Sequence, residues 1–170
     1  YLDRKLAEAA SDFEAIPSRG LSVVMLDIDH FKKINDTYGH ESGNIILIEL
    51  AKILQGFLKA KDVLARYGGE EFVFILHDCS KEEAAMFAET IRLKIEETHF
   101  SIIPDLSNDY TPIDVQITSS LGVASIPDDA NSAKGLIRSA DRALYIGGKQ
   151  AGRNRVGVLD SQQKGAIQKV

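Results

Sequence analysis

The feature that most constrains the fold is an apolar segment near the start of the chain, residues 21–28, with the sequence LSVVMLDI. Its apolar residues do not alternate with polar ones, as they would in a strand with one face in water. A strand of this kind belongs in the middle of a sheet whose two faces are both covered. The rest of the chain must therefore supply helices for two faces, and 170 residues are enough for one domain with such a core.

The elements around this strand follow from the spacing of apolar residues and from turn signals. Helices are predicted over residues 2–16, 31–38, 42–59 (capped by Ser42) and 133–147, with a further helix opened by the capping box of Ser80 and Glu83. Strands are predicted over residues 63–67, 72–76, 114–126 (bent near Gly122) and 155–159, and a loop over 102–112. This order predicts an α+β fold, a mostly antiparallel central sheet covered by helices. The domain is expected to span residues 1–159, followed by a disordered tail over 160–170.

Composition narrows the class of protein. Lys and Arg total 20 against 25 Asp and Glu, and the net charge of −5 gives no support for binding to a nucleic acid polymer or an anionic membrane. The single cysteine, Cys79, excludes a disulfide framework within the chain and fits a reducing compartment, so a cytoplasmic location is expected. No apolar run approaches the length of a membrane span. Because the chain opens at Tyr1 without Met, we expect it to be an N-terminally truncated piece of a longer protein.

Three groups of residues could carry chemistry. The first is Asp27 and Asp29 at the end of the apolar strand, where strand alternation places both carboxylates on one side. Hard divalent cations bind such oxygen ligands, and Mg²⁺ usually takes one or two carboxylates plus substrate phosphates. The alternative is a solvated turn that caps the next helix.

The second group is the GGEE segment at residues 68–71, between two predicted strands. A Gly-Gly pair predicts a hairpin with a tight primed turn, which needs positive φ, and glycine also leaves room for a ligand against bare backbone. The alternative is a solvated hairpin tip. The third group is the basic cluster over residues 149–155, just past a helix. It could contact phosphate or complement the helix dipole.

Taken together, these segments closely resemble the GGDEF family, the catalytic domains of diguanylate cyclases. The resemblance covers roughly residues 1–159, and the motifs follow the family's order. They are Asp27-x-Asp29-x-Phe31-Lys32-x-x-Asn35-Asp36-x-x-Gly39-His40-x-x-Gly43, the signature Gly68-Gly69-Glu70-Glu71-Phe72 in its GGEEF form, Thr118-x-Ser120-x-Gly122, and Ala140-Asp141-x-Ala143-Leu144-Tyr145 with Gly152-Arg153-Asn154.

The resemblance implies a ferredoxin-like fold similar to the nucleotidyl cyclases and the polymerase palm. It implies condensation of two GTP into cyclic di-GMP, a bacterial second messenger, with release of two pyrophosphates. The active form would be a homodimer in which each protomer presents one GTP to the other. A sensory or dimerising domain would precede the catalytic one.

The resemblance also implies roles for single residues. Mg²⁺ or Mn²⁺, up to two ions per site, would be held by Asp27, the Ile28 carbonyl, Glu70 and Glu71. Glu70 is the candidate base near the attacking 3′-hydroxyl. The phosphates would meet Lys32, Lys149, Arg153 and the backbone of His30, Phe31 and Gly69, while guanine would be bound by Asn35, His40 and Asn44. Divalent cations would let an acidic domain bind a polyanion, and phosphoryl transfer needs this charge neutralisation more than covalent chemistry.

Departures from the family pattern give specific expectations. Asn44 stands where the family usually has Asp, and an amide offers guanine one acceptor oxygen plus a donor, so weaker or less selective guanine binding is expected. The product-inhibition motif Arg-x-x-Asp is degenerate here, with Lys59 and Asp62 at its ends, and Thr90 stands at the position of a second arginine. Lysine cannot make the planar bidentate contact of arginine, so feeble product inhibition is expected.

Two further departures concern chain length. One residue more than usual lies between Tyr145 and Lys149, and Gly147 and Gly148 are expected to absorb it as a bulge or an early helix end. The family's opening Leu-Thr-Gly-Leu-x-Asn-Arg stretch is absent.

Other functions remain open from the sequence. One is a catalytically weak or silent module that binds GTP or cyclic di-GMP as a signalling sensor. Another is a cyclase with relaxed purine specificity. An adaptor that only dimerises would leave the acidic pair in the GGEEF segment unexplained.

Overall fold

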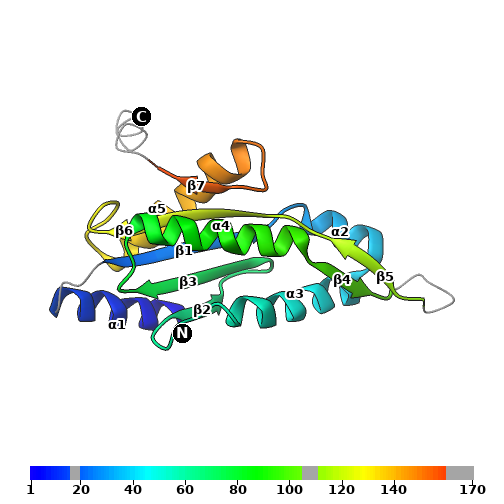
Figure 1. The fold of residues 1–170 in the computed structure, drawn as a ribbon, viewed down its shortest axis with the longest axis horizontal. Helices are drawn as coiled ribbons and strands as arrows, with labels where there is room; N and C mark the ends of the chain where they lie inside the picture. Colours follow the sequence, from blue (N-terminus) through cyan, green and yellow to red (C-terminus); the bar gives the residue numbers. More distant parts are fainter. Residues whose placement is uncertain (16–19, 105–110, 160–170) are drawn as a thin grey trace.

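The computed structural model describes residues 1–15, 20–104 and 111–159, so the predicted tail over residues 160–170 lies outside the described part. Its central sheet has the strand order β2-β3-β1-β6-β7 (Figure 1). The bounds are β1 (Leu21–Ile28), β2 (Val63–Arg66), β3 (Glu71–His77), β6 (Ser119–Ile126) and β7 (Val156–Val158). Neighbouring strands are antiparallel except β6 and β7, which are parallel. The mostly antiparallel α+β fold is thus confirmed.

Strand β1 lies in the middle of this sheet, and every residue in it is buried. Its side chains alternate between two apolar clusters. Leu26 and Ile28 belong to one cluster, and Val23 and Met25 belong to the other. This arrangement explains why the segment carries no polar alternation, since both faces of the strand meet a helical layer.

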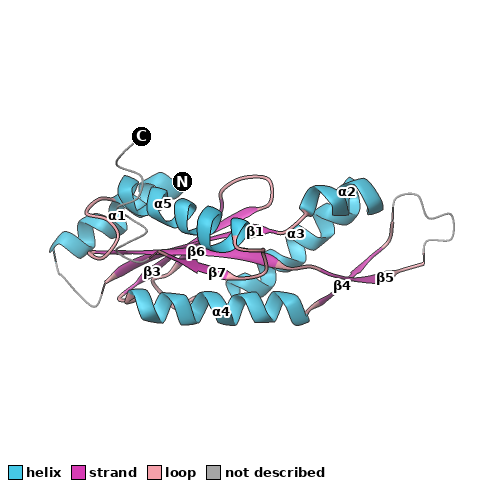
Figure 2. Cartoon of the chain, turned by 90° about the horizontal axis from the view of Figure 1, so that it is seen from above, coloured by secondary structure: helices cyan, strands magenta, loops and turns pink. Residues whose placement is uncertain are grey.

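Helices cover the two faces of the sheet (Figure 2). On one face lie α1 (Leu2–Ala15), α5 (Ala133–Ala143) and the π-helix η1 (Leu144–Gln150), which contribute to the cluster around Met25. On the other lie α3 (His40–Gln55) and α4 (Lys81–Glu97), which pack on the cluster around Leu26. The short helix α2 (Phe31–Tyr38) follows β1 directly, at the edge of the sheet where the carboxylates stand.

The start of α3 differs from the prediction. Ser42 is not its N-cap; the helix begins at His40, because Gly39 with a φ of 92° turns the chain straight from α2 into α3. Ser42 is buried inside the helix, and its hydroxyl donates to the carbonyl of Ile103 at 3.0 Å. The polar residue therefore ties α3 to the chain at Ile103 instead of capping the helix.

The predicted loop and long strand between residues 102 and 126 are also divided differently. A separate two-stranded antiparallel sheet pairs β4 (His99–Ile102) with β5 (Ile113–Gln116), and residues 105–110 lie outside the described part. The single strand predicted over 114–126 is therefore two strands. The break lies at Thr118, whose carbonyl accepts from the Asp29 N–H at 2.9 Å, and not near Gly122, which lies inside the β1–β6 ladder.

Candidate active site

The candidate metal ligands gather where β1 ends beside the start of β3. Asp27 stands directly opposite Glu71 in the β1–β3 ladder, and the Ile28 N–H donates to the Glu70 carbonyl at 3.4 Å. Asp27 is only 7% exposed, whereas Glu70 and Glu71 are half-buried. Antiparallel pairing thus brings Glu70 and Glu71 to Asp27, which lies 43 and 44 residues earlier in the chain. The three carboxylates lie at the end of the sheet where β1 stops and β3 starts.

The hairpin that carries Glu70 is held by its own backbone and by an arginine. The Tyr67 N–H donates to the Glu71 carbonyl at 2.8 Å, and the Arg66 guanidinium donates to the Gly69 carbonyl at 2.6 and 3.1 Å. The predicted hairpin is present, but the predicted primed turn is wrong, because neither Gly68 nor Gly69 has a positive φ.

The two glycines of the hairpin differ in what surrounds them. A Cβ on Gly68 would collide with the Glu71 carboxylate, so a side chain at this position would displace a candidate metal ligand. A Cβ on Gly69 would meet nothing within 4 Å, so this exposed residue offers bare backbone, as expected of a surface that a ligand approaches.

Lys149, near the end of η1, contacts the same group of carboxylates. Its ammonium group donates to the Asp27 carboxylate at 2.8 Å. Gly147 and Gly148, where a bulge or an early helix end is expected, lie within η1, whose turns are wider than those of an α-helix. η1 packs so closely on β7 that a Cβ on Gly147 would meet the Gly157 backbone at 2.5 Å.

Charge and burial at this edge favour a cation. Burial raises the pKa of the Asp27 carboxyl, and the hydrogen bond from Lys149 offsets part of that rise. Burial also raises the pKa of Glu71, and the negative charge of Asp27 adds to it. Two carboxylates whose charged forms are disfavoured by burial are stabilised by a hard divalent ion beside them.

The donor set fits such an ion without completing its shell. Among the described residues, no three His, Cys, Asp or Glu side chains converge closely enough to bind a metal by themselves. Asp27 and Glu71 supply oxygens, and the Ile28 carbonyl and Glu70 lie next to them in the ladder. Mg²⁺ typically binds few protein carboxylates and completes its octahedron with waters and substrate phosphates, so this set matches its needs.

The raised pKa of Asp27 predicts a pH effect on the metal-free protein. A carboxyl whose folded pKa lies above its unfolded value of 3.8 stabilises the fold below that pH, and this stability is lost as pH rises through the folded pKa. Asp27→Asn has no carboxyl to titrate at this position, so with chelator present it should keep its stability where wild type loses it. The unfolding free energy of wild type minus that of Asp27→Asn should therefore fall as pH rises. Urea unfolding between pH 3.5 and 7 measures it, and parallel curves would contradict the assignment.

The predicted phosphate-binding residues at the start of α2 lie beside this edge. Phe31 is buried and anchors the helix, while Lys32 and His30 are exposed. His30 adopts a left-handed conformation with φ 57° and ψ 28°, which turns the chain from β1 into α2. The N–H groups of Lys33 and Ile34 donate to the His30 carbonyl, at 2.8 and 3.3 Å. The N–H groups at the very start of a helix have no partner within it, so those of Phe31 and Lys32 are the ones that could meet an anion.

The predicted guanine-binding residues lie on the neighbouring helices α2 and α3. Asn35 is half-buried, and among the described residues its Oδ1 atom has no hydrogen-bond partner although it is buried. A Cβ on Gly43 would collide with this oxygen, so glycine makes room for it. His40 and Asn44 are exposed. An unpaired buried acceptor is able to take an N–H donor from a ligand.

Arg153 lies in the loop between η1 and β7. Gly152, Arg153 and Asn154 have successive φ angles of 119°, 65° and 48°, and the Arg153 N–H donates to the Gly148 carbonyl at 3.0 Å. Arg153 is exposed, and its charge acts to lower the pKa of Asp27, which places it in the same electrostatic site.

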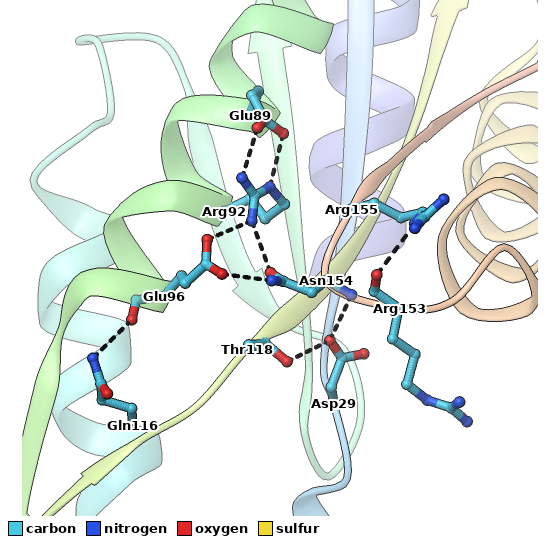
Figure 3. A network of polar contacts seen from close by, with 9 residues as sticks. All are labelled: Asp29, Glu89, Arg92, Glu96, Gln116, Thr118, Arg153, Asn154 and Arg155. Atoms are coloured by element: carbon cyan, nitrogen blue, oxygen red, sulfur yellow. Dashed lines mark hydrogen bonds and ion pairs between the residues drawn. The ribbon is translucent and has the colours of Figure 1, made fainter.

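Asp29, which the sequence pairs with Asp27, has a different role. Its carboxylate accepts from the Thr118 hydroxyl at 2.8 Å and from the Asn154 N–H at 2.9 Å (Figure 3). It also accepts from the Ser120 hydroxyl at 2.7 Å. With these bonds it joins three segments and is not free to bind a metal. The Thr-x-Ser spacing at residues 118–120 was the sequence signal for this role.

Asp62, predicted to belong to a degenerate inhibitory site, has a structural role. The Asp62 carboxylate accepts from the N–H groups of Lys59 at 3.0 Å and His77 at 3.1 Å. Asp62 therefore closes the turn before β2 and ties it to the end of β3. The Lys59 side chain is exposed.

The chain matches a known family model and curated proteins. The family model described as "Diguanylate cyclase, GGDEF domain" matches residues 1–155. Diguanylate cyclase A of Treponema denticola is 47% identical over 136 residues, covering 80% of this chain and 34% of the relative. Response regulator PleD of Caulobacter vibrioides is 36% identical over 136 residues, covering 80% of this chain and 28% of the relative. The chain thus spans about a third of the length of these relatives, or less.

Solved structures of similar domains match nearly the whole chain. The active GGEEF domain of a diguanylate cyclase from Vibrio cholerae has a TM-score of 0.79 at 30% identity, covering 93% of this chain and 94% of that one. The GGDEF domain of DgcB from Caulobacter crescentus, in complex with c-di-GMP, has a TM-score of 0.80 at 32% identity, covering 92% and 87%. None of the described helices is long and apolar enough to cross a bilayer. The chain belongs to the GGDEF-domain family of diguanylate cyclases.

Proposed function

We propose that this domain condenses two molecules of GTP into cyclic di-GMP and releases two pyrophosphates. The observation that carries the proposal is the pair of Asp27 and Glu71, set opposite each other at the end of β1, with Lys149 on Asp27. The intact GGEEF hairpin and the named cyclases among the relatives support it. Because GTP is the substrate, we place the domain in the cytoplasm.

The chemistry consists of two equivalent phosphoryl transfers. The 3′-oxygen of one GTP bonds to the α-phosphorus of the other, the bond from that phosphorus to the pyrophosphate oxygen breaks, and the hydroxyl proton leaves. Glu70 accepts this proton in our proposal. Lys32, Lys149 and Arg153 bind the triphosphate and offset its charge, since positioning and electrostatics dominate such transfers.

A divalent metal ion, Mg²⁺ or Mn²⁺, would lie against Asp27, the Ile28 carbonyl, Glu70 and Glu71. When bound, it would polarise the phosphoryl oxygens and neutralise their charge, with a second ion possible. Burial raises the pKa of both Asp27 and Glu71, and the charge of Asp27 adds to the rise at Glu71; a bound cation would offset these effects. A net charge of −5 would no longer oppose the binding of a polyanion.

The proposal requires two copies of the chain, because each GTP supplies a nucleophile and an electrophile. One protomer would present its GTP to that of the partner, aligned about a two-fold axis. The test is therefore made on the domain fused to a dimerising coiled coil. This protein is incubated with GTP and Mg²⁺ or Mn²⁺, and the product is identified by mass. A product with the mass of cyclic di-GMP is expected; bound but unconverted GTP would support the silent module instead.

The exposed amide of Asn44 predicts relaxed discrimination between purines. A carboxylate accepts from both guanine N1–H and the exocyclic amine, so Asn44→Asp is expected to raise the preference for GTP over ATP about tenfold. Turnover of GTP, ATP and their mixture measures this. Asn131→Asp, the same change at another exposed position, is the control. Identical profiles in wild type and Asn44→Asp would contradict the assignment.

We propose that product inhibition through Lys59 and Asp62 is weak. Restoring the arginines with Lys59→Arg and Thr90→Arg is expected to strengthen inhibition by cyclic di-GMP about tenfold or more, measured as the inhibition constant. Tight product binding by wild type that Asp62→Ala abolishes would contradict this. Asp62→Ala also removes two backbone hydrogen bonds, so its thermal unfolding is measured alongside.

A further inference from the structure

The loop that carries Arg153 has an unusual backbone. Three consecutive residues, from Gly152 to Asn154, have positive φ angles, and two of them have side chains. Residues other than glycine disfavour this region, so such a loop keeps its shape only when its surroundings hold it. The contacts of Asn154 supply part of that support, beside the bond of the Arg153 N–H to the Gly148 carbonyl and that of Arg155 to the Arg153 carbonyl.

Asn154 is held on two sides (Figure 3). On the side of α4, its Oδ1 accepts from the Arg92 guanidinium at 2.8 Å, and its Nδ2 donates to the Glu96 carboxylate at 2.7 Å. On the side of β1, its backbone N–H donates to the Asp29 carboxylate at 2.9 Å. Side chain and backbone of Asn154 are therefore fixed by different elements of the fold.

The partner on α4 is itself immobilised. Arg92 donates from Nε and Nη2 to the two carboxylate oxygens of Glu89 at 2.9 and 2.8 Å, and from Nη1 to Glu96 at 2.8 Å. It is only 9% exposed. Because these charge-assisted bonds fix the Arg92 guanidinium, the N–H that it donates to Asn154 is held in one position.

The other partner, Asp29, connects the loop to the candidate metal ligands at the end of β1. Asp29 lies two residues after Asp27, and its bonds to Thr118 and Ser120 lock it to β6. A continuous chain of contacts therefore runs from α4 through Asn154 and Asp29 to the segment that holds Asp27. By contrast, the Arg153 guanidinium makes no hydrogen bond or ion pair within the described residues, and Figure 3 shows it projecting away from this network.

We propose that Asn154, held by Arg92 and Glu96, is a positioning residue. It orients Arg153 toward the triphosphate and fixes it relative to the candidate metal ligands at the end of β1. The proposal rests on the proposed function for the identity of the ligand, a nucleoside triphosphate. Two ion pairs and an amide hold a loop in which the Arg153 guanidinium is exposed and has no partner within the described residues. Support of this kind fits a residue that must meet a ligand in a fixed geometry.

Asn154→Gly tests the side-chain bonds of Asn154 separately from its backbone conformation. Glycine adopts positive φ freely, so only the side-chain bonds are lost. The probe is the α,β-methylene analogue of GTP with Mg²⁺, which cannot release pyrophosphate. We expect Asn154→Gly to weaken its binding about tenfold. Arg153→Ala is expected to weaken binding at least as much. The double variant should bind no more weakly than Arg153→Ala, because Asn154 acts through Arg153. Effects that multiply, or unchanged binding by Asn154→Gly, would overturn the proposal.

A second pair of variants guards against a folding effect. Glu96→Ala is expected to weaken binding in the same direction as Asn154→Gly, and Glu96→Gln, which keeps an acceptor oxygen, is expected to recover most of the affinity. Gln116→Ala is the matched control, since within the described residues the Gln116 side chain donates to the Glu96 carbonyl alone, at 3.3 Å, and binding should stay within twofold. Failure of Glu96→Gln to recover affinity would count against the proposal.

Amide hydrogen exchange without nucleotide distinguishes this proposal from the proposed function. The amide of Arg153 is expected to exchange at least about tenfold faster in Asn154→Gly than in wild type, and at the wild-type rate in Gln116→Ala. A wild type that binds no analogue would refute the proposed function alone. Unchanged exchange at Arg153 would refute the positioning role of Asn154, whatever the protein binds.

Discussion

Asp27→Asn is expected to lower the rate of cyclic di-GMP formation at least about a hundredfold, because it removes the most buried carboxylate of the proposed metal site. The amide keeps the size of the side chain but offers the metal a neutral oxygen. It also frees Lys149 from its 2.8 Å ion pair. The measurement is turnover of the dimerised domain across a series of Mg²⁺ and Mn²⁺ concentrations, with product identified by mass.

The control for this variant is Asp78→Asn, the same change at the opposite end of β3. Asp78 is exposed and has a φ of 52°, a conformation that asparagine tolerates well. Its turnover should stay within twofold of wild type. Wild-type turnover by Asp27→Asn at low metal concentration would remove Asp27 from the metal site.

Gly122→Ala is expected to lower the free energy of unfolding by about 3 kcal/mol. Gly122 of β6 pairs with Gly157 of β7, and α5 runs directly over this pair. A Cβ on Gly122 would collide with backbone atoms of Ala140 and Leu144, which cannot rotate away as a side-chain end could. Urea unfolding measures the loss. Because η1 continues from α5, the displaced helix should also move Lys149 from Asp27 and lower turnover in the protein that remains folded.

Gly69→Ala is the matched control for the packing effect. Its Cβ would meet nothing within 4 Å and its φ is not positive, so stability should change by less than about 0.5 kcal/mol. Turnover should nevertheless fall, since the methyl group occupies the bare backbone that the nucleotide approaches. If Gly122→Ala were no less stable than Gly69→Ala, the close packing of α5 would not be needed for the fold.

The central part of the fold could be predicted because its signal is local. The segment of residues 21–28 is apolar throughout, and the GGEE segment interrupts two short apolar runs, so both strand positions and the hairpin follow from neighbouring residues. The register that sets Asp27 opposite Glu71 is a property of strand pairing, which the sequence pattern does not specify. The strands β4 and β5 have four residues each, too few for alternation to be recognised against the turn residues around them.

The polar part of the site was harder to predict because its partners are distant in the chain. Asp29 resembles a second metal ligand until Thr118 and Ser120 are seen beside it, 89 and 91 residues later. Arg92 has the pattern of a solvated helix face, since Glu89 and Glu96 flank it at helical spacing, and its bond to Asn154 spans 62 residues. Only tertiary contact separates such residues from ordinary surface charges.

The π-helical turn of η1 has a consequence for comparing sequences across the family. A helix that widens locally accepts an inserted residue while both of its ends keep their places, with Leu144 in the core and Lys149 on Asp27. An alignment gap between Tyr145 and Lys149 therefore does not by itself mark a cyclase that has lost its lysine.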